Sequence, residues 1–288
     1  MKLVRYGPKG REQPGIIDAD GALRSLSKIV SDIDGESLST AGLAAIRKAN
    51  IARLPKVPGR PRIGACVGKV SKFVAIGLNF EDHARESGLP IPKEPIVFNK
   101  WTTCISGPND TVVMPPGSVK SDWEVELGVI IGRTARFIPE KDWAKYVAGY
   151  CVVNDVSERE YQIERGGGQW DKGKGCDTYG PIGPWMVTKD EIPDPQNLKM
   201  RLSVNGKIMQ NGSTSTMIFG VAELVAYLSR FMTLLPGDVI CTGTPPGVGL
   251  GMKPTPQFLK AGDVMEVSIE GLGTQTQKVV GSTKSAGR

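Results

Sequence analysis

The chain has 288 residues, of which 40% are hydrophobic and 23% charged, with a formal net charge of +6 and a pI of about 9.0. This composition can bury a sizeable core and excludes an intrinsically disordered chain, and the length predicts one large domain with at most a small appendage. Because the basic residues are scattered and form no block, the charge favours an attraction for anionic substrates, and we expect no binding to nucleic acid.

Residues 1–65 have the pattern of a small N-terminal unit. Its expected elements are two short strands, a hairpin turn and one helix, over residues 3–6, 15–18, 20–21 and 40–49. Residues 54–61 then contain three prolines, which is typical of a stiff linker. We therefore predict a boundary between an N-terminal domain, 1–65, and a larger domain, 66–288.

The larger domain is rich in strands, glycines and prolines. Short apolar runs predict strands at 73–77, 112–113, 123–132, 148–153, 239–241 and 263–269. Residues 202–209 contain the Asn-Gly pair of a tight hairpin turn. Apolar residues with helical spacing predict one helix from 221 to 235, ended by Pro236-Gly237.

Membrane and disulfide-linked classes are not expected. No apolar run approaches the roughly 18 residues that would span a bilayer, and residues 1–7 lack the apolar core of a signal peptide. The cysteines form an odd, widely spaced set without a Cys-x-x-Cys pair: Cys66, Cys104, Cys151, Cys176 and Cys241. Such a set is typical of reduced thiols in a cytoplasmic protein.

The segment from Asp122 to Gly132 combines acidic and apolar residues. Alternate side chains on a strand share a face, so Asp122, Glu124 and Glu126 would point the same way. Buried carboxylates are unfavourable unless they are paired or bound to a metal. The segment alone also fits an exposed edge strand whose acids face water.

A further carboxylate, Asp155, ends the apolar run that begins at Cys151. An acid at the end of a strand is well placed to join a carboxylate pair on a neighbouring strand. Three carboxylates without clustered Cys or His describe an all-oxygen site, which suits Mg²⁺, Mn²⁺ or Ca²⁺ and not zinc.

The chain has a single histidine, His83. If a helix begins just before it, Asn79 would be the N-cap, and Glu86 would lie on the same face as His83. A carboxylate there could orient the imidazole and raise its basicity, which would activate a water molecule. Taken alone, the segment also fits a surface histidine on an ordinary charged helix.

Two glycine-containing loops have the residues of ligand contacts. Lys174 lies between Gly173 and Gly175, where the backbone can approach a ligand closely. Residues 242–249 follow a strand and could bind a carboxylate through backbone N–H groups. Either loop alone also fits a connection without function. The chain has no complete phosphate-binding P-loop, dinucleotide-binding motif or Gly-x-Ser-x-Gly nucleophile elbow.

Five motifs in chain order closely resemble the fumarylacetoacetate hydrolase family. They are Gly77-Leu78-Asn79-Phe80-Glu81-Asp82-His83, Asp122 to Gly132 with its Glu-x-Glu, Asn154 to Arg159 with Gln162, Gly173-Lys174-Gly175, and Thr242-Gly243-Thr244-Pro245. The likeness spans about residues 70–282. It implies an α+β, β-rich fold in which mixed sheets roll around the site, with a small N-terminal α/β domain, in a homodimer.

The resemblance also implies a role for each site residue. Three carboxylates would hold Mg²⁺ or Mn²⁺: Glu124, Glu126 and Asp155. His83 and Glu86 would activate water, and Lys174 would stabilise developing negative charge. The substrate-binding residues would be Gly243 and Thr244, which hold a carboxylate, together with Arg159 and Gln162.

The implied reaction is metal-dependent hydrolysis of a carbon–carbon bond in a small 2,4-dioxo acid, which gives pyruvate and a second acid. Acylpyruvates, maleylpyruvate and diketo-deoxy sugar acids all fit this chemistry. The alternative within the family is oxaloacetate decarboxylation or dioxo-acid isomerisation, which has less need of the His83–Glu86 pair. The chain departs from the family pattern at Leu78, where many relatives have a basic residue, and at Phe80, where Tyr is frequent.

Overall fold

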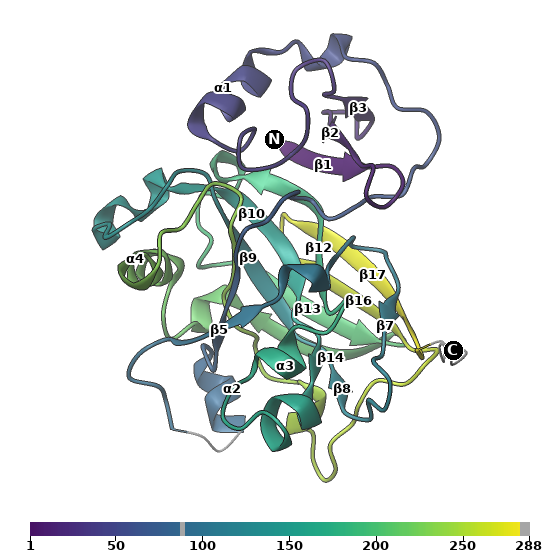
Figure 1. Cartoon of the computed structure of the whole chain (residues 1–288), viewed down its shortest axis with the longest axis vertical. Coiled ribbons are helices and arrows are strands. Elements are labelled where there is room, and N and C mark those ends of the chain that lie inside the picture. Colours follow the sequence, from purple (N-terminus) through teal and green to yellow (C-terminus); the bar gives the residue numbers. More distant parts are fainter. Residues whose placement is uncertain (87–89, 283–288) are drawn as a thin grey trace, which may run out of the picture.

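The computed structural model describes residues 1–86 and 90–282. Its largest sheet has ten strands and runs from the N-terminal unit into the rest of the chain (Figure 1). In spatial order the strands are β3 (Leu23–Ser25), β2 (Gln13–Ile17), β1 (Lys2–Tyr6), β12 (Gly180–Thr188), β10 (Val147–Asn154), β9 (Val125–Ile131), β15 (Val239–Cys241), β4 (Phe73–Gly77) and β5 (Ile96–Lys100), and β6 (Ile105–Ser106) pairs with β12 off this path. Pairs β15–β4 and β12–β6 are parallel, so the sheet is mixed, as expected.

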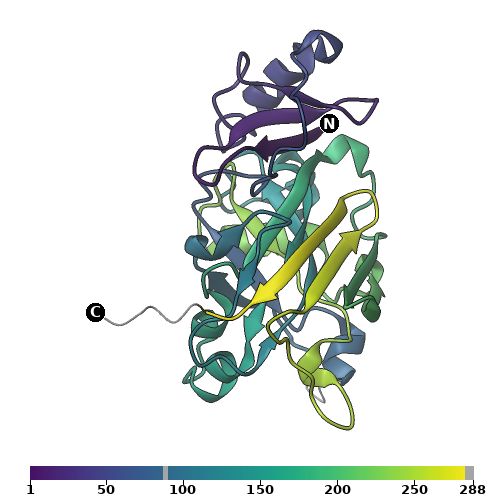
Figure 2. The same cartoon turned by 90° about the vertical axis from the view of Figure 1, so that its right-hand side faces the viewer.

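A second, five-stranded sheet lies against the first and ends in the long C-terminal strands seen side by side in Figure 2. It consists of β14 (Lys207–Ser213), β13 (Lys199–Val204), β16 (Val264–Ile269), β17 (Gly273–Val280) and β7 (Val112–Val113), while β8 (Ser121–Asp122) pairs with β11 (Ser157–Glu158). The Asn205-Gly206 turn between β13 and β14 has positive φ at both residues, which confirms the predicted hairpin.

The core alternates with the pleat of the large sheet. Leu127 and Val129 of β9 pack in the cluster shared with the five-stranded sheet, whereas Ile130 packs in the cluster on the other face. Because alternate side chains on a strand share a face, Glu126 lies on the same face of β9 as Ile130. Glu126, the acidic residue of β9, therefore points away from the five-stranded sheet.

Within the described residues, four α-helices accompany the sheets: α1 (Thr40–Lys48), α2 (Glu81–Glu86), α3 (Asp171–Lys174) and α4 (Val221–Phe231). Ser39 caps α1 by accepting a hydrogen bond from Gly42 N, as its position before the helix favours. The predicted helix from 221 to 235 was too long. It stops at Phe231 because Met232 is extended and Leu234 forms a β-bridge with Ala135.

The predicted strand at 123–132 was also too long at its start. Asp122 belongs to β8, and β9 begins only at Val125. The break follows from two hydrogen bonds of Trp123. Its backbone N donates to the adjacent Asp122 carboxylate, and its Nε1 donates to Gly247 O, which is distant in the sequence. Asp122 is thereby separated from Glu124 and Glu126.

The N-terminal unit shares its sheet and its core with the rest of the chain. Strand β1 pairs with β12 through Lys2↔Val187 and Leu3↔Met186. Leu3 packs in the same hydrophobic cluster as Met186 and Ile130. The boundary at residue 65 stays a prediction. Among the described residues, no helix has the length and apolar character that crossing a membrane requires.

Candidate active site

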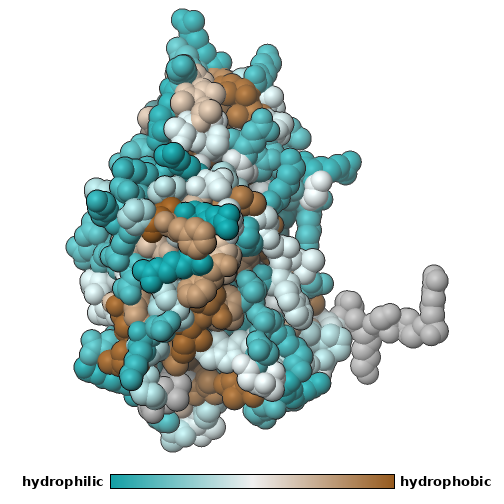
Figure 3. Space-filling model, turned by 60° about the vertical axis from the view of Figure 1, so that its left-hand side comes forward, coloured by the Kyte–Doolittle hydropathy of each residue, from teal (hydrophilic) through white to brown (hydrophobic). Residues whose placement is uncertain are grey.

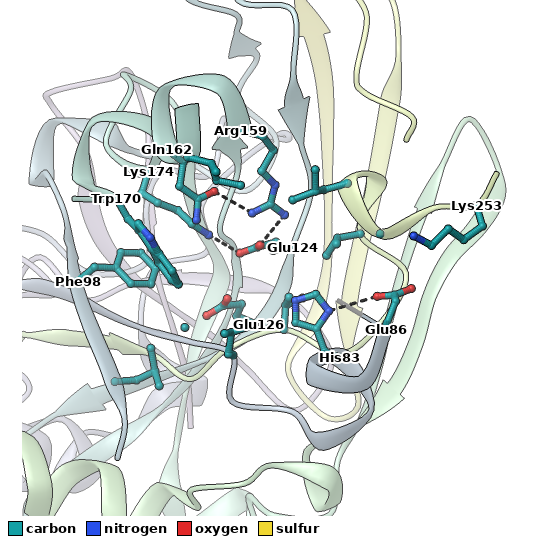
Figure 4. A pocket seen from close by; sticks show the side chains of 18 residues that line it. His83, Glu86, Phe98, Glu124, Glu126, Arg159, Gln162, Trp170, Lys174 and Lys253 are labelled. Atoms are coloured by element: carbon teal, nitrogen blue, oxygen red, sulfur yellow. Dashed lines mark hydrogen bonds and ion pairs between the residues drawn. The ribbon is translucent and has the colours of Figure 1, made fainter. Parts of the chain in front are cut away.

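A cavity of about 260 Å³ lies among α2, α3, β9 and the segment that follows β15 (Figure 4). In Figure 1, α2 and α3 lie toward the end of the molecule opposite the N-terminal unit. Ile76, Phe98, Trp170 and Val248 give the cavity apolar walls, and charged side chains converge on it. Apolar walls with a few converging polar groups are typical of small-molecule sites.

A cluster of three carboxylates lies at this cavity, and two of them, Glu124 and Glu126, line it. Glu124, Glu126 and Asp155 each offer one oxygen, and these oxygens all lie within 4.8 Å of one another. The β9–β10 pairing brings them together, because it places Val153 opposite Glu126 and Asp155 N donates to Glu124 O over 2.9 Å. All three carboxylates are buried. The expected cluster is therefore present, but Asp122 is not part of it.

Two cations neutralise Glu124. Arg159 Nη2 and Lys174 Nζ donate to its two oxygens over 2.7 and 2.5 Å. Burial opposes ionisation, but Lys174 and Arg159 prevail and lower the pKa of Glu124 to about 2. Arg159 also donates to Asp122 Oδ2 over 2.8 Å, so Asp122 holds the arginine in place.

Glu126 has the opposite environment. Gly243 N donates to its Oε2 over 2.9 Å. Burial, together with the charges of Asp155 and Glu124, raises the pKa of Glu126 well above its usual range. Crowded, buried carboxylate oxygens with excess negative charge are the donor set that a hard divalent cation fits. The three carboxylates could therefore hold a metal ion.

The single histidine faces this cluster from α2. His83 Nδ1 lies 3.2 Å from Glu86 Oε2, and His83 stands between Glu86 and Glu126 in Figure 4. Glu86 also accepts from Gly247 N at 3.2 Å. Burial raises the pKa of Glu86, but these two hydrogen bonds outweigh it and lower the pKa below its usual value. An ionised Glu86 can fix one imidazole tautomer and leave the other ring nitrogen for chemistry.

The N-cap expected for α2 was wrong. Asn79 Oδ1 accepts from Phe219 N, and its Nδ2 donates to the carbonyls of Phe219 and Thr242. The first helical bond of α2 instead runs from Ala84 N to Phe80 O. Asn79 therefore fixes the start of α2 to the end of β15, where long-range contacts compete successfully with local capping.

Three of the residues expected to bind substrate line the cavity, namely Arg159, Gln162 and Thr244, and Gly243 directly precedes Thr244. Thr244 Oγ1 donates to Val125 O over 2.9 Å, and Gly243 N is engaged by Glu126. Gln162, on the π-helical turn Glu160–Glu164, accepts from Arg159 Nη1 over 3.0 Å. A contact from Gly243 N to a substrate carboxylate would compete with its bond to Glu126.

Lys100 and the Phe98–Trp170 pair were not expected at the site. The rings of Phe98 and Trp170 have centroids 5.3 Å apart, and Lys174 Nζ lies 5.1 Å from the Phe98 centroid. Lys100 Nζ donates to Asp155 Oδ1 over 2.6 Å. The only signal in the sequence is a lysine at the end of an apolar strand, which ordinarily marks a solvent-exposed strand end.

Comparison with known proteins agrees with this architecture. Residues 72–280 match the model of the fumarylacetoacetate (FAA) hydrolase C-terminal family. A Burkholderia lata protein whose name classes it provisionally as a hydrolase is 64% identical over 277 residues, covering 96% of this chain and 98% of that protein.

Solved structures match over nearly the whole chain. The fumarylacetoacetate hydrolase of Exiguobacterium antarcticum is 33% identical with a TM-score of 0.85 and covers 98% of this chain and 100% of that one. The maleylpyruvate hydrolase of Sphingobium sp. SYK-6, in complex with manganese(II) and pyruvate, is 27% identical with a TM-score of 0.81 and the same coverage. The 2-hydroxyhepta-2,4-diene-1,7-dioate isomerase of Mycobacterium marinum is 33% identical with a TM-score of 0.77, covering 99% and 100%. The chain, with its β-rich mixed sheets and its buried acidic cluster, belongs to the fumarylacetoacetate hydrolase family.

Proposed function

We propose that this protein is a Mg²⁺- or Mn²⁺-dependent hydrolase that cleaves a carbon–carbon bond in a small 2,4-dioxo acid to give pyruvate and a second acid. The observation that carries the proposal is the His83–Glu86 pair, which shares one cavity with Glu124 and Glu126, the two carboxylates that cluster with Asp155. A water-activating pair opposite a cation-binding triad is the minimum that metal-assisted hydrolysis needs. The manganese and pyruvate in the Sphingobium maleylpyruvate hydrolase structure add support.

The proposed reaction assigns a task to each group. A bound Mg²⁺ or Mn²⁺ would polarise the carboxylate and 2-oxo group of the substrate. His83, oriented by Glu86, takes a proton from water, and the oxygen of that water attacks the distal carbonyl. The carbon–carbon bond breaks, and its electron pair stays with the pyruvate half, where Lys174 stabilises the negative charge until that carbon is protonated.

The alternative is decarboxylation or isomerisation at the same carboxylates, as the isomerase among the structural neighbours suggests. Neither reaction requires a water molecule to be deprotonated. The partly buried contact between His83 and Glu86 favours hydrolysis, because Glu86 is held by Gly247 N as well and is aimed at the imidazole.

Release of pyruvate from a small panel of acids tests the proposal. The panel holds acetylpyruvate, fumarylpyruvate, maleylpyruvate, a diketo-deoxy sugar acid and oxaloacetate, each with Mg²⁺, Mn²⁺ or EDTA. Metal-dependent release from any of the first four is expected. Release of pyruvate from oxaloacetate alone would favour the decarboxylase. No release from any of the five acids would contradict both hydrolysis and decarboxylation.

Binding of the metal should release protons. Glu126 has a raised pKa in the metal-free protein, so it keeps a proton above 4.5, the usual value, and must lose it to become a ligand. The affinity of the site for Mg²⁺ or Mn²⁺ should therefore rise with pH until the pH exceeds the raised pKa of Glu126. Up to about one proton should be released for each ion bound. Calorimetry in two buffers of different ionisation enthalpy measures this release. Glu86→Gln, the control, should leave the proton release unchanged. Metal binding that does not depend on pH would contradict the assigned role of Glu126.

We also propose that the protein is a homodimer. Hydrophobic residues gather in a band on the face seen in Figure 3. Large exposed hydrophobic side chains include Trp101, Phe137 and Phe231, which are 53%, 65% and 65% exposed. Exposed apolar patches of this kind mark interaction surfaces. Light scattering after size-exclusion chromatography should give twice the chain mass of 30.9 kDa, and a monomer at micromolar concentration would contradict the dimer.

A further inference from the structure

Lys100 is a buried cation that the proposed reaction does not use. It is the last residue of β5, and its side chain is fully buried. Its ammonium donates to Asp155 Oδ1 over 2.6 Å, to Val156 O over 3.3 Å and to the carbonyl of Lys174. Three acceptors match the three N–H bonds of an ammonium group. Lys100 and Asp155 thus form an ion pair in which both side chains are fully buried.

Asp155 is therefore held between two lysines that occupy different positions. Lys174 Nζ donates to its Oδ2 over 2.8 Å and also lines the cavity. Lys100 holds the other oxygen, Oδ1, and is not among the cavity-lining residues. A cation that enters the cavity would compete with Lys174 for Glu124 and Asp155 Oδ2. The Lys100–Asp155 pair can persist throughout.

We propose that Lys100 is a positioning residue, the permanent counter-ion of Asp155, which keeps Oδ2 directed at the Lys174 ammonium and anchors the backbone that carries Lys174. Lys174 is then the exchangeable counter-ion, displaced from the carboxylates when a metal binds. This inference rests on the proposed role of Asp155 as a metal ligand. It makes Lys100 part of what preserves the site when no metal is bound.

Charge balance makes the inference measurable. Without Lys100, the metal-free site holds one more uncompensated buried carboxylate, which is strongly destabilising. A divalent cation at the triad supplies the missing positive charge. Lys100→Met, which keeps an unbranched side chain one heavy atom shorter and removes its charge, should therefore destabilise the metal-free protein more than the metal-loaded protein.

The experiment compares melting temperatures in EDTA and in saturating Mn²⁺ for wild type, Lys100→Met and Lys72→Met. Lys72 is the matched control, because its Nζ lies 2.9 Å from the fully buried Asp238 and away from the cavity. Lys100→Met should lower the melting temperature in EDTA by roughly 5–15 °C and by clearly less in Mn²⁺. Lys72→Met should lower the melting temperature equally in EDTA and in Mn²⁺. Equal losses for Lys100→Met in the two conditions would overturn the inference and leave Lys100 a structural ion pair.

A second variant covers the case in which Lys100→Met does not fold. Lys100→Met with Asp155→Asn removes both charges of the pair, and it should be more stable in EDTA than Lys100→Met alone. A double variant no more stable than the single one would contradict the inference. If instead wild type gains no stability from Mn²⁺ or Mg²⁺, the proposed metal site itself has failed, which is a separate result.

Discussion

Glu126→Gln is expected to abolish metal binding and metal-dependent activity while leaving the metal-free protein at least as stable as wild type. The glutamine removes one of three clustered carboxylates. Loss of an outer partner of a metal site already costs about 10–100-fold in affinity, so loss of a ligand should weaken binding by at least about 10²-fold.

The stability half of this prediction follows from charge. The pKa of Glu126 is raised because burial, Asp155 and Glu124 all disfavour its ionised form. Glu126 therefore lowers the stability of the metal-free fold as the pH rises above 4.5, its usual value, because the folded chain keeps it protonated while the unfolded chain ionises it, and this penalty grows until the raised pKa is passed. Glutamine avoids the charge, and its amide oxygen can still accept from Gly243 N.

Calorimetric titration with Mn²⁺ and thermal unfolding in EDTA measure the two halves separately. Glu140→Gln, at an exposed position of a short 3₁₀ turn, is the control and should behave as wild type in both. Undiminished Mn²⁺ affinity in Glu126→Gln would refute the carboxylate site. A large loss of stability in EDTA would instead mean that Glu126 is ionised and paired in the metal-free protein.

His83→Ala should lower hydrolysis by about 10²-fold or more while leaving any oxaloacetate decarboxylation largely intact. His83 is the only histidine of the chain, and it connects Glu86 to the side of the cavity that holds the carboxylates. Hydrolysis requires a proton to leave water, whereas decarboxylation needs only stabilisation of the negative charge left on the substrate.

Controls separate chemistry from folding in this variant. The stabilisation of the protein by bound metal should be unchanged, because the proposed metal ligands are Glu124, Glu126 and Asp155 and do not include His83. Arg85→Ala, on the same short helix and paired with the exposed Glu81, should keep full activity. Equal losses of hydrolysis and decarboxylation in His83→Ala would mean that His83 supports the site as a whole and does not act as the base.

The sequence by itself determined the elements whose signals are local. The Asn205-Gly206 turn, the strand at Phe73–Gly77 and helix α1 formed where periodicity and turn residues predicted them. The Glu-x-Glu pattern of Glu124 and Glu126, at the start of β9, was informative for the same reason. Buried acids on an otherwise apolar strand have few physical explanations, and a metal site is one of them.

Only the tertiary structure decided which partners these residues take. Asn79 binds Phe219 and Thr242 instead of capping α2, and Asp122 holds Arg159 instead of joining Glu124. The sequence did not indicate that Lys100 is buried, because a lysine at the end of a strand is ordinarily exposed. Its burial follows from the packing of Asp155, the residue after β10, against it. Capping and alternation are properties of neighbours along the chain, whereas the pairing of buried charges depends on elements far apart in sequence, which only the packed sheets bring together.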